Sequence, residues 1–323
     1  MILVVLFHVA RRCWQITGMG ISIHDYLVQI RMPMFFFISG FVLFKIGVVW
    51  NIKHITQFFL KKIPIQLIFP SIFFLAYLHS RNIPILYGVS IPNGYWFTYV
   101  LFEYYVFYAI IMFCIRNNKS NIVLLILGFF LFFINYRPLY NAIPLSEGFK
   151  VFFKVSRWNY FIFFVIGTIS KKYFQQMESF LDSKWTLPIC ISFYFLVNSF
   201  RNIIYLPDTI LSLPLTITGL IILFSFFRIN KSSFSKNHVI GVTLQYIGRR
   251  TLDIYLIHFF LIPDNLKFIT VFINHPIPII EATCSLFISI LIIAGSLLIS
   301  NIIRLSPFLA HWVFGAKYPT NKP

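Results

Sequence analysis

The stretch PIIEATCSLFISILIIAGSLLISNIIR, residues 278–304, decides the fold class. A helix needs about 20 mainly apolar residues to cross roughly 30 Å of hydrocarbon, and this stretch is long and apolar enough to do so. Comparable stretches recur along the chain. We predict spans at residues 1–10, 28–50, 63–79, 95–115, 121–136, 158–171, 186–204, 209–228, 251–273 and 278–304. The sequence therefore predicts an all-α integral membrane protein, a single bundle of about ten transmembrane helices.

The composition excludes a water-soluble globule. Hydrophobic residues make up 59% of the 323 residues, charged residues make up only 11%, and the mean hydropathy is +0.81. A soluble domain carries roughly 45–50% apolar and about 25% charged residues, so this chain has too little polar surface to face water on all sides. We find no inserted soluble segment, linker or internal repeat. One transmembrane domain over residues 1–323 is therefore expected.

The net charge of +18 is better explained by membrane topology than by nucleic-acid binding. Lys and Arg lie mainly in short gaps between apolar stretches, not clustered on a soluble face. With the amino terminus inside, 17 of the 27 basic residues fall in cytoplasmic segments, which predicts that both termini are cytoplasmic. The 10 on the opposite side are Arg11, Arg12, Arg31, Arg81, Arg137, Lys150, Lys154, Arg157, Arg201 and Lys267.

The first predicted span is short. Ten residues at 1.5 Å each cover about 15 Å, which is half of the hydrocarbon thickness. The segment lacks the basic leading region and small-residue cleavage site of a signal peptide. We therefore expect that the chain as given lacks the front of its first helix.

Four stretches, in this order, resemble the acyltransferase family 3 enzymes, which are membrane-bound O-acyltransferases of surface polysaccharides. They are ILVVLFHV (2–9), PMFFFISGF (33–41), GYWFTYVLFEYYVFY (94–108) and IGRRTLDIYLIHFFL (247–261). The resemblance implies transfer of an acyl group, such as acetyl, from acyl-CoA to a hydroxyl of a cell-surface or lipid-linked glycan. It also implies a place in the bacterial inner membrane, with acyl-CoA as co-substrate and no bound cofactor.

Two departures from the family pattern stand out. The family places a basic residue about ten positions before its histidine, and that position falls ahead of Met1 here. The family's Arg-x-x-Arg pair before a proline is replaced by KKIPIQLIFP (61–70), with Gln66 near the expected second arginine. Lysine can hold a phosphate as a point charge but cannot form the bidentate contact of arginine.

His8 is the candidate catalytic base, following the resemblance. Moving an acyl group from a thioester to a sugar hydroxyl needs a base for the hydroxyl proton, and histidine suits this role because its pKa lies near neutrality. On position alone, an interfacial histidine at a helix end is the better explanation of His8.

His258 lies seven residues, or about 10 Å, into its helix from Thr251. It either lines the substrate site or bonds a neighbouring helix as a neutral histidine, and Tyr255 stands on the same face. Asp253 has a structural explanation. Thr251 is expected to cap the helix, and Asp253 then lies in its first turn, where the dipole favours an acid.

The remaining substrate-side candidates have structural alternatives. Glu103 lies in mid-span and should be protonated or paired across helices. Ser39 and Gly40 either let helices pack closely or lie beside the acyl donor. Arg31 either anchors at headgroups or holds the acceptor.

The basic inner segments are the candidate binding site for the phosphates of coenzyme A. The residues are Lys61, Lys62, Arg249 and Arg250. Their alternative explanation is the positive-inside rule alone. No metal site is expected, because the sequence shows no metal-ligand cluster, and it also shows no Gly-rich phosphate loop or Ser-x-x-Lys pattern.

We therefore predict a membrane-bound O-acyltransferase with acyl-CoA, a glycan and the lipid bilayer as partners. One alternative is a transporter or flippase for a lipid-linked glycan, which would show inverted repeats and broken helices that we do not find. The other is an inactive truncated remnant, supported by the short first span.

Overall fold

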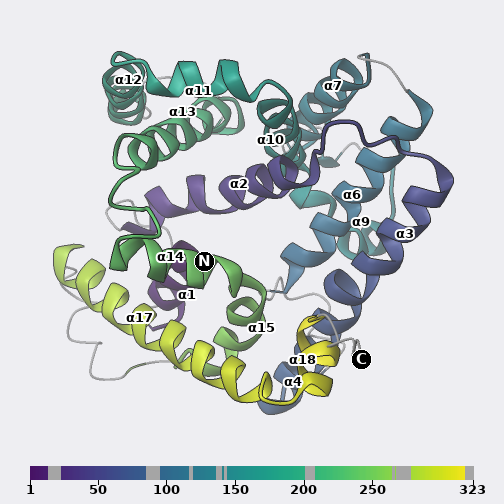
Figure 1. Ribbon diagram of the computed structural model, residues 1–323, viewed down its shortest axis with the longest axis vertical. Helices are drawn as coiled ribbons and strands as arrows, with labels where there is room; N and C mark the ends of the chain where they lie inside the picture. Colours follow the sequence, from purple (N-terminus) through teal and green to yellow (C-terminus); the bar gives the residue numbers. More distant parts are fainter. Residues whose placement is uncertain are drawn as a thin grey trace. The chain divides into compact units, whose positions relative to one another are not determined.

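The computed structural model describes residues 1–13, 23–84, 95–115, 119–135, 140–141, 144–200, 208–263, 266 and 278–316. Within these ranges every regular element is a helix, and no strand occurs (Figure 1). The basic residues at 116, 137, 201, 267, 317 and 322 lie outside the described residues. The fold class predicted from the sequence, all-α, is confirmed for the described part.

The chain forms two compact units. The first unit comprises Met1–Val28, Thr56–Phe102 and Gln245–Pro323, and the second comprises Gln29–Ile55 and Glu103–Leu244. The helices α2 (Ile23–Leu43), α3 (Ile52–Ile63), α6 (Trp96–Cys114) and α14 (Val239–Arg249) contain the boundaries. The further elements of the first unit are α1 (Ile2–Cys13), η1 (Pro64–Ile68), α4 (Phe69–Ser80), α15 (Thr251–Leu261), α17 (Pro278–Ile303) and α18 (Pro307–Phe314). Those of the second are α7 (Lys119–Phe133), α9 (Glu147–Phe152), η2 (Val155–Tyr160), α10 (Phe161–Lys172), α11 (Phe174–Asp182), α12 (Thr186–Phe200) and α13 (Asp208–Ile229).

Helices long and apolar enough to cross a membrane occur at four of the predicted spans. They are Ile52–Ser80, Trp96–Cys114, Ile210–Ile229 and Ile279–Ile303. The pair α11 and α12 makes a fifth candidate if both belong to one span, bent by 78° at the break between them. The protein is therefore a multi-pass helical membrane protein.

Four of the other predicted spans hold shorter helices. Both α1 and α10 have 12 residues, α15 has 11 and α7 has 15. The first helix continues to Cys13, three residues beyond its predicted end. From residue 267 on, the predicted span 251–273 lies outside the described residues. The count of ten spans stays a prediction.

The short helix α15 is buried on nearly all sides in the first unit. The side chains from Asp253 to Phe259 are all buried, and the helix packs against α17 and α4. Apolar residues of α1, such as Val5 and Val9, belong to the same core as Ile254 and Ile257. Because every face of α15 meets protein, the polar groups that it carries need partners from neighbouring helices.

The second unit contains a close crossing of α2 and α10. Gly40 and Gly167 lie at the contact, and a Cβ atom added at either would collide with the carbonyl oxygen of Phe164 or Phe37. Glycine allows two helix backbones to approach in this way because it lacks a side chain. Eight of the twelve residues of α10 are buried, so this helix is central to the second unit.

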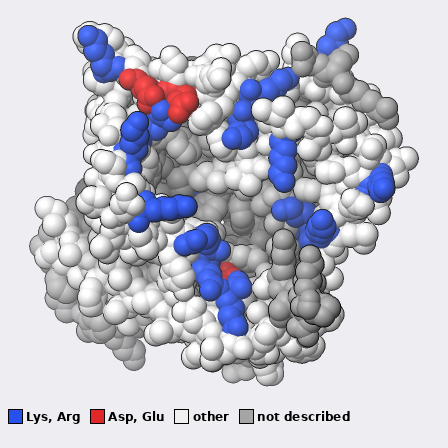
Figure 2. Space-filling model, viewed as in Figure 1, with Lys and Arg blue, Asp and Glu red and all other residues white. Residues whose placement is uncertain are grey.

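Charged contacts also join helices within the second unit. Arg228, near the end of α13, donates to both carboxylate oxygens of Asp182 at 2.6 Å and to Glu178 at 2.8 Å. These three ionic contacts tie α11 to α13. On the face drawn in Figure 2, Lys and Arg are widespread, whereas acidic side chains occupy small areas, the largest over α11.

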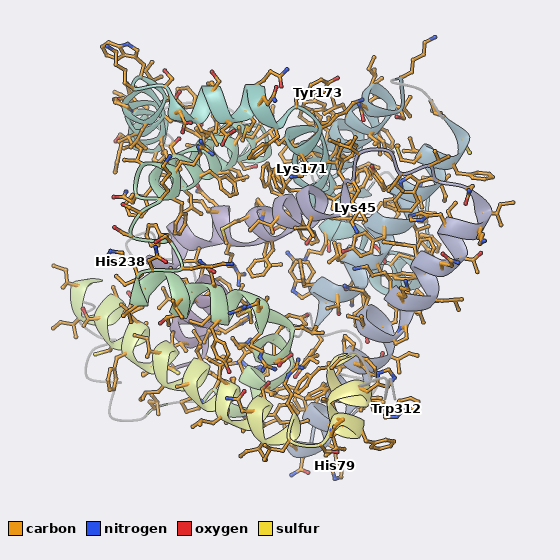
Figure 3. All side chains as sticks on the ribbon, viewed as in Figure 1. Lys45, His79, Lys171, Tyr173, His238 and Trp312 are labelled. Atoms are coloured by element: carbon orange, nitrogen blue, oxygen red, sulfur yellow. The ribbon has the colours of Figure 1, made fainter. Side chains whose placement is uncertain are left out.

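Lysines at the end of α10 lie against aromatic rings. Nζ of Lys171 is 4.9 Å from the ring centroid of Phe41 and 5.1 Å from that of Phe174. Figure 3 labels Lys171 and Tyr173 at this end of α10, and Lys45 just after the end of α2. A positive charge in the last turn of a helix also complements the helix dipole.

Candidate active site

Two histidines meet in the core of the first unit. His8 lies on α1 and His258 on α15, and the centroids of their rings are 5.6 Å apart. The ring of Phe259 lies beside both, with its centroid 4.8 Å from that of His8 and 4.0 Å from that of His258. His8 is half-buried, whereas His258 is 0% exposed. A molecule that approaches this pair therefore reaches His8 first.

The two ring nitrogens of His258 have different surroundings. Nδ1 lies 2.9 Å from the carbonyl oxygens of both Ile254 and Tyr255, in the preceding turn of α15. Nε2 is buried and has no hydrogen-bond partner among the described residues. The backbone of α15 therefore fixes one side of the ring and leaves the other side for a partner.

Arg12 places a positive charge close to the histidines. It follows His8 by one helical turn, so that both residues lie on the same side of α1. Its guanidinium carbon is 5.5 Å from the ring centroids of both Tyr77 and Phe259. Aromatic faces attract a cation at this range, so these rings stabilise the arginine within the core.

Tyrosines line the core beside the histidines. The hydroxyl of Tyr95 donates a 2.6 Å hydrogen bond to the carbonyl oxygen of Leu256 on α15. Tyr255 is 6% exposed, and its ring centroid lies 5.8 Å from that of Tyr95 and 6.2 Å from that of His258. The structure thus places Tyr255 next to His258, as its spacing on the helix predicts.

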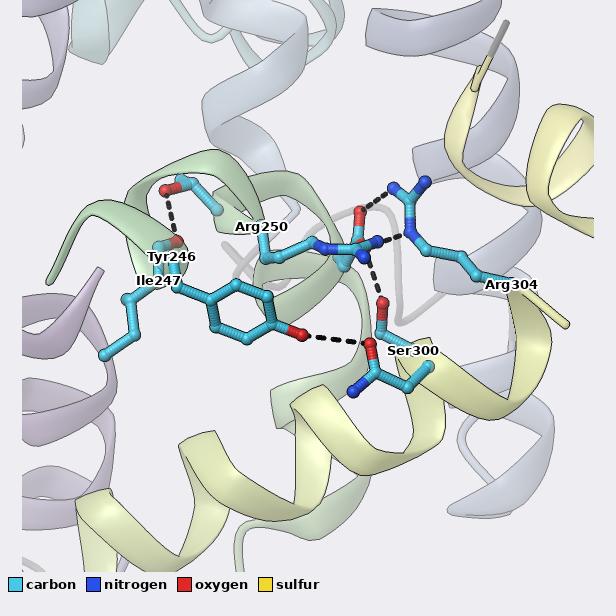
Figure 4. A network of polar contacts seen from close by, with 8 residues as sticks. Tyr246, Ile247, Arg250, Ser300 and Arg304 are labelled. Carbon is cyan, nitrogen blue, oxygen red and sulfur yellow. Dashed lines mark hydrogen bonds and ion pairs between the residues drawn. The ribbon is translucent and has the colours of Figure 1, made fainter. Parts of the chain in front are cut away.

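Asp253 is the centre of a polar network at the start of α15 (Figure 4). Its carboxylate accepts hydrogen bonds from Nε and Nη2 of Arg304 at 2.8 Å and 2.9 Å. The hydroxyl of Ser300 donates to it at 2.5 Å and Nη1 of Arg250 at 3.3 Å. Asp253 is only 2% exposed, and arginines from two other segments of the first unit balance its charge there.

The expected cap of α15 is wrong. The hydroxyl of Thr251 donates backwards to the carbonyl oxygens of Ile247 at 3.3 Å and Gly248 at 2.8 Å. The residue at the cap position is Arg250, and its side chain makes no capping hydrogen bond. Asp253 does lie in the first turn, but its carboxylate pairs with arginines. Thr251 satisfies carbonyls of α14, because the turn between the helices brings them within reach.

The predicted phosphate-binding residues lie at helix ends in the first unit. Lys61 and Lys62 occupy the last turn of α3, Arg249 ends α14 and Arg250 follows it. The side chains of Lys61 and Arg249 are exposed, and Nζ of Lys62 lies 5.6 Å from the ring centroid of Phe58. The exposed pair is therefore better placed to meet a soluble anion than Arg250, which binds a carboxylate.

Gln66 lies in η1, a single π-helical turn between α3 and α4. It is 7% exposed, and its Oε1 atom has no hydrogen-bond partner among the described residues. A π-helical turn is rare and occurs often at functional sites. Where the family pattern has an arginine, this chain therefore places a neutral, buried amide.

In the second unit, Ser39 and Gly40 have contacts that explain them structurally. Ser39 donates to the carbonyl oxygen of Phe35 at 2.8 Å, within its own helix, and Gly40 forms the close contact with α10. Arg31 is half-buried on the same helix, two residues before Pro33. A role of these residues in substrate binding stays a prediction.

Glu103 pairs with an indole. Its carboxylate accepts a 2.8 Å hydrogen bond from Nε1 of Trp158 in η2. The next residue, Tyr104, is 0% exposed and donates to the carbonyl oxygen of Arg157 at 2.6 Å. Glu103 therefore has a partner on another element, as its place in an apolar span requires.

Three predicted site residues, His8, Tyr255 and His258, lie together in the first unit. The four basic candidates belong to the same unit, and the second unit holds Arg31, Ser39, Gly40 and Glu103. Among the described residues no group of three or more His, Cys, Asp or Glu side chains is arranged to hold a metal ion.

Arg12 and Arg304 were not predicted from the sequence as parts of these polar clusters. The spacing of four residues between His8 and Arg12 was a readable signal, because such residues share a helix face. Arg304 is 51 residues from Asp253, and no local pattern connects the two.

Comparison with known proteins gives one match. A family model described as an acyltransferase domain matches residues 1–300 of the chain. Searches of curated proteins and of solved structures each returned no match. The matched range includes both histidines of the pair and all four stretches that carry the resemblance.

Proposed function

The chain belongs to acyltransferase family 3, and we propose that it transfers an acyl group, such as acetyl, from acyl-CoA to a hydroxyl of a cell-surface or lipid-linked glycan. The observation that carries this proposal is the histidine pair inside the matched range. A half-buried histidine beside a fully buried one, among apolar helices, costs free energy of folding. Ionisable residues in such places therefore tend to be functional.

In this reaction His8 is the general base. Its ring nitrogen takes the proton of the acceptor hydroxyl as the hydroxyl oxygen attacks the carbonyl carbon of the thioester. The tetrahedral intermediate then collapses, the carbon–sulfur bond breaks, and the ester remains on the glycan. The thiolate of coenzyme A takes the proton back from His8. Histidine suits both steps because its pKa lies near neutrality.

The negative charge that develops on the carbonyl oxygen needs a cation or a hydrogen-bond donor. Arg12 lies on the same helix face as His8, and its charge lies within the aromatic core. Such donors contribute strongly in a site from which water is excluded. In this proposal Arg12 stabilises the intermediate and His8 moves the proton.

The donor's phosphates bind the basic helix ends in our proposal. Lys61, Lys62 and Arg249 offer positive charge in the last turns of α3 and α14, and Arg250 adds a guanidinium already oriented by Asp253. Lysine contacts a phosphate as a point charge. We expect donor affinity to fall steeply as salt concentration rises, because such charges are screened.

On the acceptor side, we propose that Tyr255 and His258 of the first unit contact the glycan. Arg31, Ser39, Gly40 and Glu103 are the candidate acceptor-binding residues of the second unit. The protein would reside in the bacterial inner membrane with about ten spans and both termini in the cytoplasm. Acyl-CoA would then enter from the cytoplasm, where the basic inner segments meet it.

The test uses membranes of a bacterial host that expresses the chain, with radiolabelled acetyl-CoA as the probe. We expect label in the glycan fraction, released by mild base as an ester's acyl group should be. His8→Ala should lower this transfer at least about 100-fold, because general-base catalysis contributes about that much. The control is His79→Ala, at the exposed end of α4 (Figure 3), which should transfer normally.

Protein levels in the membrane are measured alongside, so that lost activity is separated from lost protein. Undiminished transfer by His8→Ala at matched levels would remove His8 from the mechanism. No transfer by the unaltered chain, together with movement of labelled lipid-linked glycan across the membrane, would favour a transporter instead.

A further inference from the structure

The hydrogen bonds of His258 determine which of its nitrogens carries the proton. Nδ1 lies 2.9 Å from the carbonyl oxygens of Ile254 and Tyr255. A carbonyl oxygen can only accept a hydrogen bond, so Nδ1 must be the donor. In the neutral ring the other nitrogen, Nε2, then carries a lone pair and can only accept. The backbone of α15 thus holds His258 as one tautomer.

Nε2 of His258 is a buried acceptor that needs a donor. The residue is 0% exposed, and Nε2 has no hydrogen-bond partner among the described residues. A buried polar atom without a partner needs an explanation, and a role in catalysis is one of them. Two carbonyls hold the opposite side of the ring, so the ring cannot turn to exchange the roles of its nitrogens without losing both bonds.

His8 lies close enough to supply that donor after a small movement of its ring. Its ring centroid lies 5.6 Å from that of His258, whereas two imidazoles that share a hydrogen bond of about 2.9 Å between nitrogens have centroids slightly more than about 5 Å apart. Both histidines contact the ring of Phe259, which holds their helices at this separation. His8 is half-buried, so part of its side chain remains accessible.

We propose that His258 is the positioning residue for His8: Nε2 of His258 accepts a hydrogen bond from the core-facing ring nitrogen of His8. This inference rests on the proposed function, in which His8 is the base. With its proton held on the core side, the other nitrogen of His8 presents its lone pair to the acceptor hydroxyl. In many sites with an activated nucleophile, the base is held in its working orientation by a further group that bonds its second nitrogen.

The protons balance without a charge on His258. When His8 takes the hydroxyl proton it becomes a cation with two N–H groups, and its bond to Nε2 becomes charge-assisted and stronger. His258 keeps its single proton on Nδ1 throughout. Burial disfavours a second positive charge there, and so does the nearby Arg12 guanidinium, 5.5 Å from the ring centroid of Phe259. His258 therefore accepts a hydrogen bond but does not carry the proton away.

The kinetic test compares two substitutions in the purified, full-length protein, with acetyl-CoA and a native membrane glycan fraction. His258→Phe keeps a ring but removes the acceptor, and we expect kcat to fall about 100-fold with KM for acetyl-CoA unchanged. His258→Gln keeps an acceptor oxygen near the position of Nε2, and it should recover a measurable part of the loss. His311→Phe is the matched control, since Nδ1 of His311 also lies near a backbone carbonyl, that of Ala316 at 2.7 Å. It should leave kcat unchanged.

A second measurement does not depend on activity. Nitrogen NMR of protein labelled in its histidine rings distinguishes protonated from unprotonated ring nitrogens. We expect the signal that His258→Gln removes to belong to a neutral ring protonated at Nδ1. The His8 signal, identified by its loss in His8→Ala, should change its tautomer balance in His258→Gln or His258→Phe.

The outcomes separate the two proposals. If the unaltered protein transfers acetyl groups and needs His8, but His258→Phe retains full kcat, only the positioning role is wrong. The role is also wrong if His258 is protonated at Nε2, or if the Phe and Gln variants lose activity equally at normal protein levels. If the unaltered protein transfers nothing, the proposed function fails, and the tautomer measurement still reports on His258.

Discussion

Asp253 and Asp182 each bind an arginine through two hydrogen bonds, but their surroundings differ. Arg304 holds Asp253 at 2.8 Å and 2.9 Å, and Arg228 holds Asp182 at 2.6 Å through both oxygens. The side chain of Asp253 is 2% exposed, whereas that of Asp182 is 53% exposed. The shorter pair is thus the one that solvent screens. At the scale of single residues, burial, more than distance, should set the energetic value of each pair.

Substituting each aspartate by asparagine tests this comparison. Asp253→Asn removes a buried carboxylate that balances the charges of both Arg304 and Arg250, so we expect a loss of about 3 kcal/mol in the free energy of unfolding. Asp182→Asn should cost less than about 1 kcal/mol, because the carboxylate that it removes is exposed and its ion pair is screened by water. Thermal unfolding of the purified protein in detergent, followed by tryptophan fluorescence, measures both. Equal losses of unfolding free energy in the two variants would show that burial does not set the energetic value of these ion pairs.

Among the elements, the crossing of α2 and α10 depends on two glycines. Gly40 of α2 contacts the backbone of α10 near Phe164, and Gly167 of α10 contacts that of α2 near Phe37. The contacts are reciprocal, so each helix presents a glycine to a carbonyl of the other. Closely packed helices of this kind are stabilised by dispersion contacts, which a single added methyl group prevents.

Gly40→Ala should therefore destabilise the second unit, by about 1–3 kcal/mol, because the new methyl group meets a backbone carbonyl that cannot move aside. The control is Gly148→Ala in α9, where an added Cβ has no atom within 4 Å. That substitution should be neutral or slightly stabilising, since alanine favours a helix. The measurement is the midpoint of thermal unfolding in detergent. A Gly40→Ala protein as stable as the unaltered one would contradict the close crossing.

The sequence predicted some elements well and others poorly, for physical reasons. Apolar length alone identifies helices such as α17, because crossing the membrane is a property of one segment. Within the described residues, α15 ends earlier than the predicted span does. The stability of α15 comes from neighbours on all sides, and apolar length alone does not reveal them. The pairing of Glu103 across helices was predictable from the cost of burying a charge, but the identity of Trp158 was not. The two glycines at 40 and 167 become partners only when their helices cross.

The chain as a whole carries an excess of positive charge, and its distribution is expected to orient it in the membrane. Lys171 and Lys172 lie in the last turn of α10, and Lys236 lies in the turn between α13 and α14. All three belong to the segments predicted to be cytoplasmic. Arg81 follows α4 and is predicted to face outward, where its Nη2 donates to the carbonyl oxygen of Ile262 at 3.1 Å. Basic residues resist transfer across the membrane, which is the basis of the rule.

Reporter fusions measure this orientation directly. Fusions placed after Lys172 and after Lys236 should have cytoplasmic activity, and a fusion after Arg81 should report the external side. The expectation follows from the uneven distribution of Lys and Arg, of which 17 of 27 lie in segments predicted to be cytoplasmic. A cytoplasmic signal from the fusion after Arg81 would reverse the orientation, and with it the side from which acyl-CoA enters.

The ion pair between Asp253 and Arg304 also has a consequence for biosynthesis. The ribosome makes the arginine 51 residues after the aspartate, and α17 lies between them. At about 5–20 residues per second, translation leaves α15 for several seconds without its main counter-charge. Until then Arg250, three positions earlier, supplies the near positive charge. Stable packing of nascent α15 is therefore expected only after Arg304 has been synthesised and α17 has packed against it.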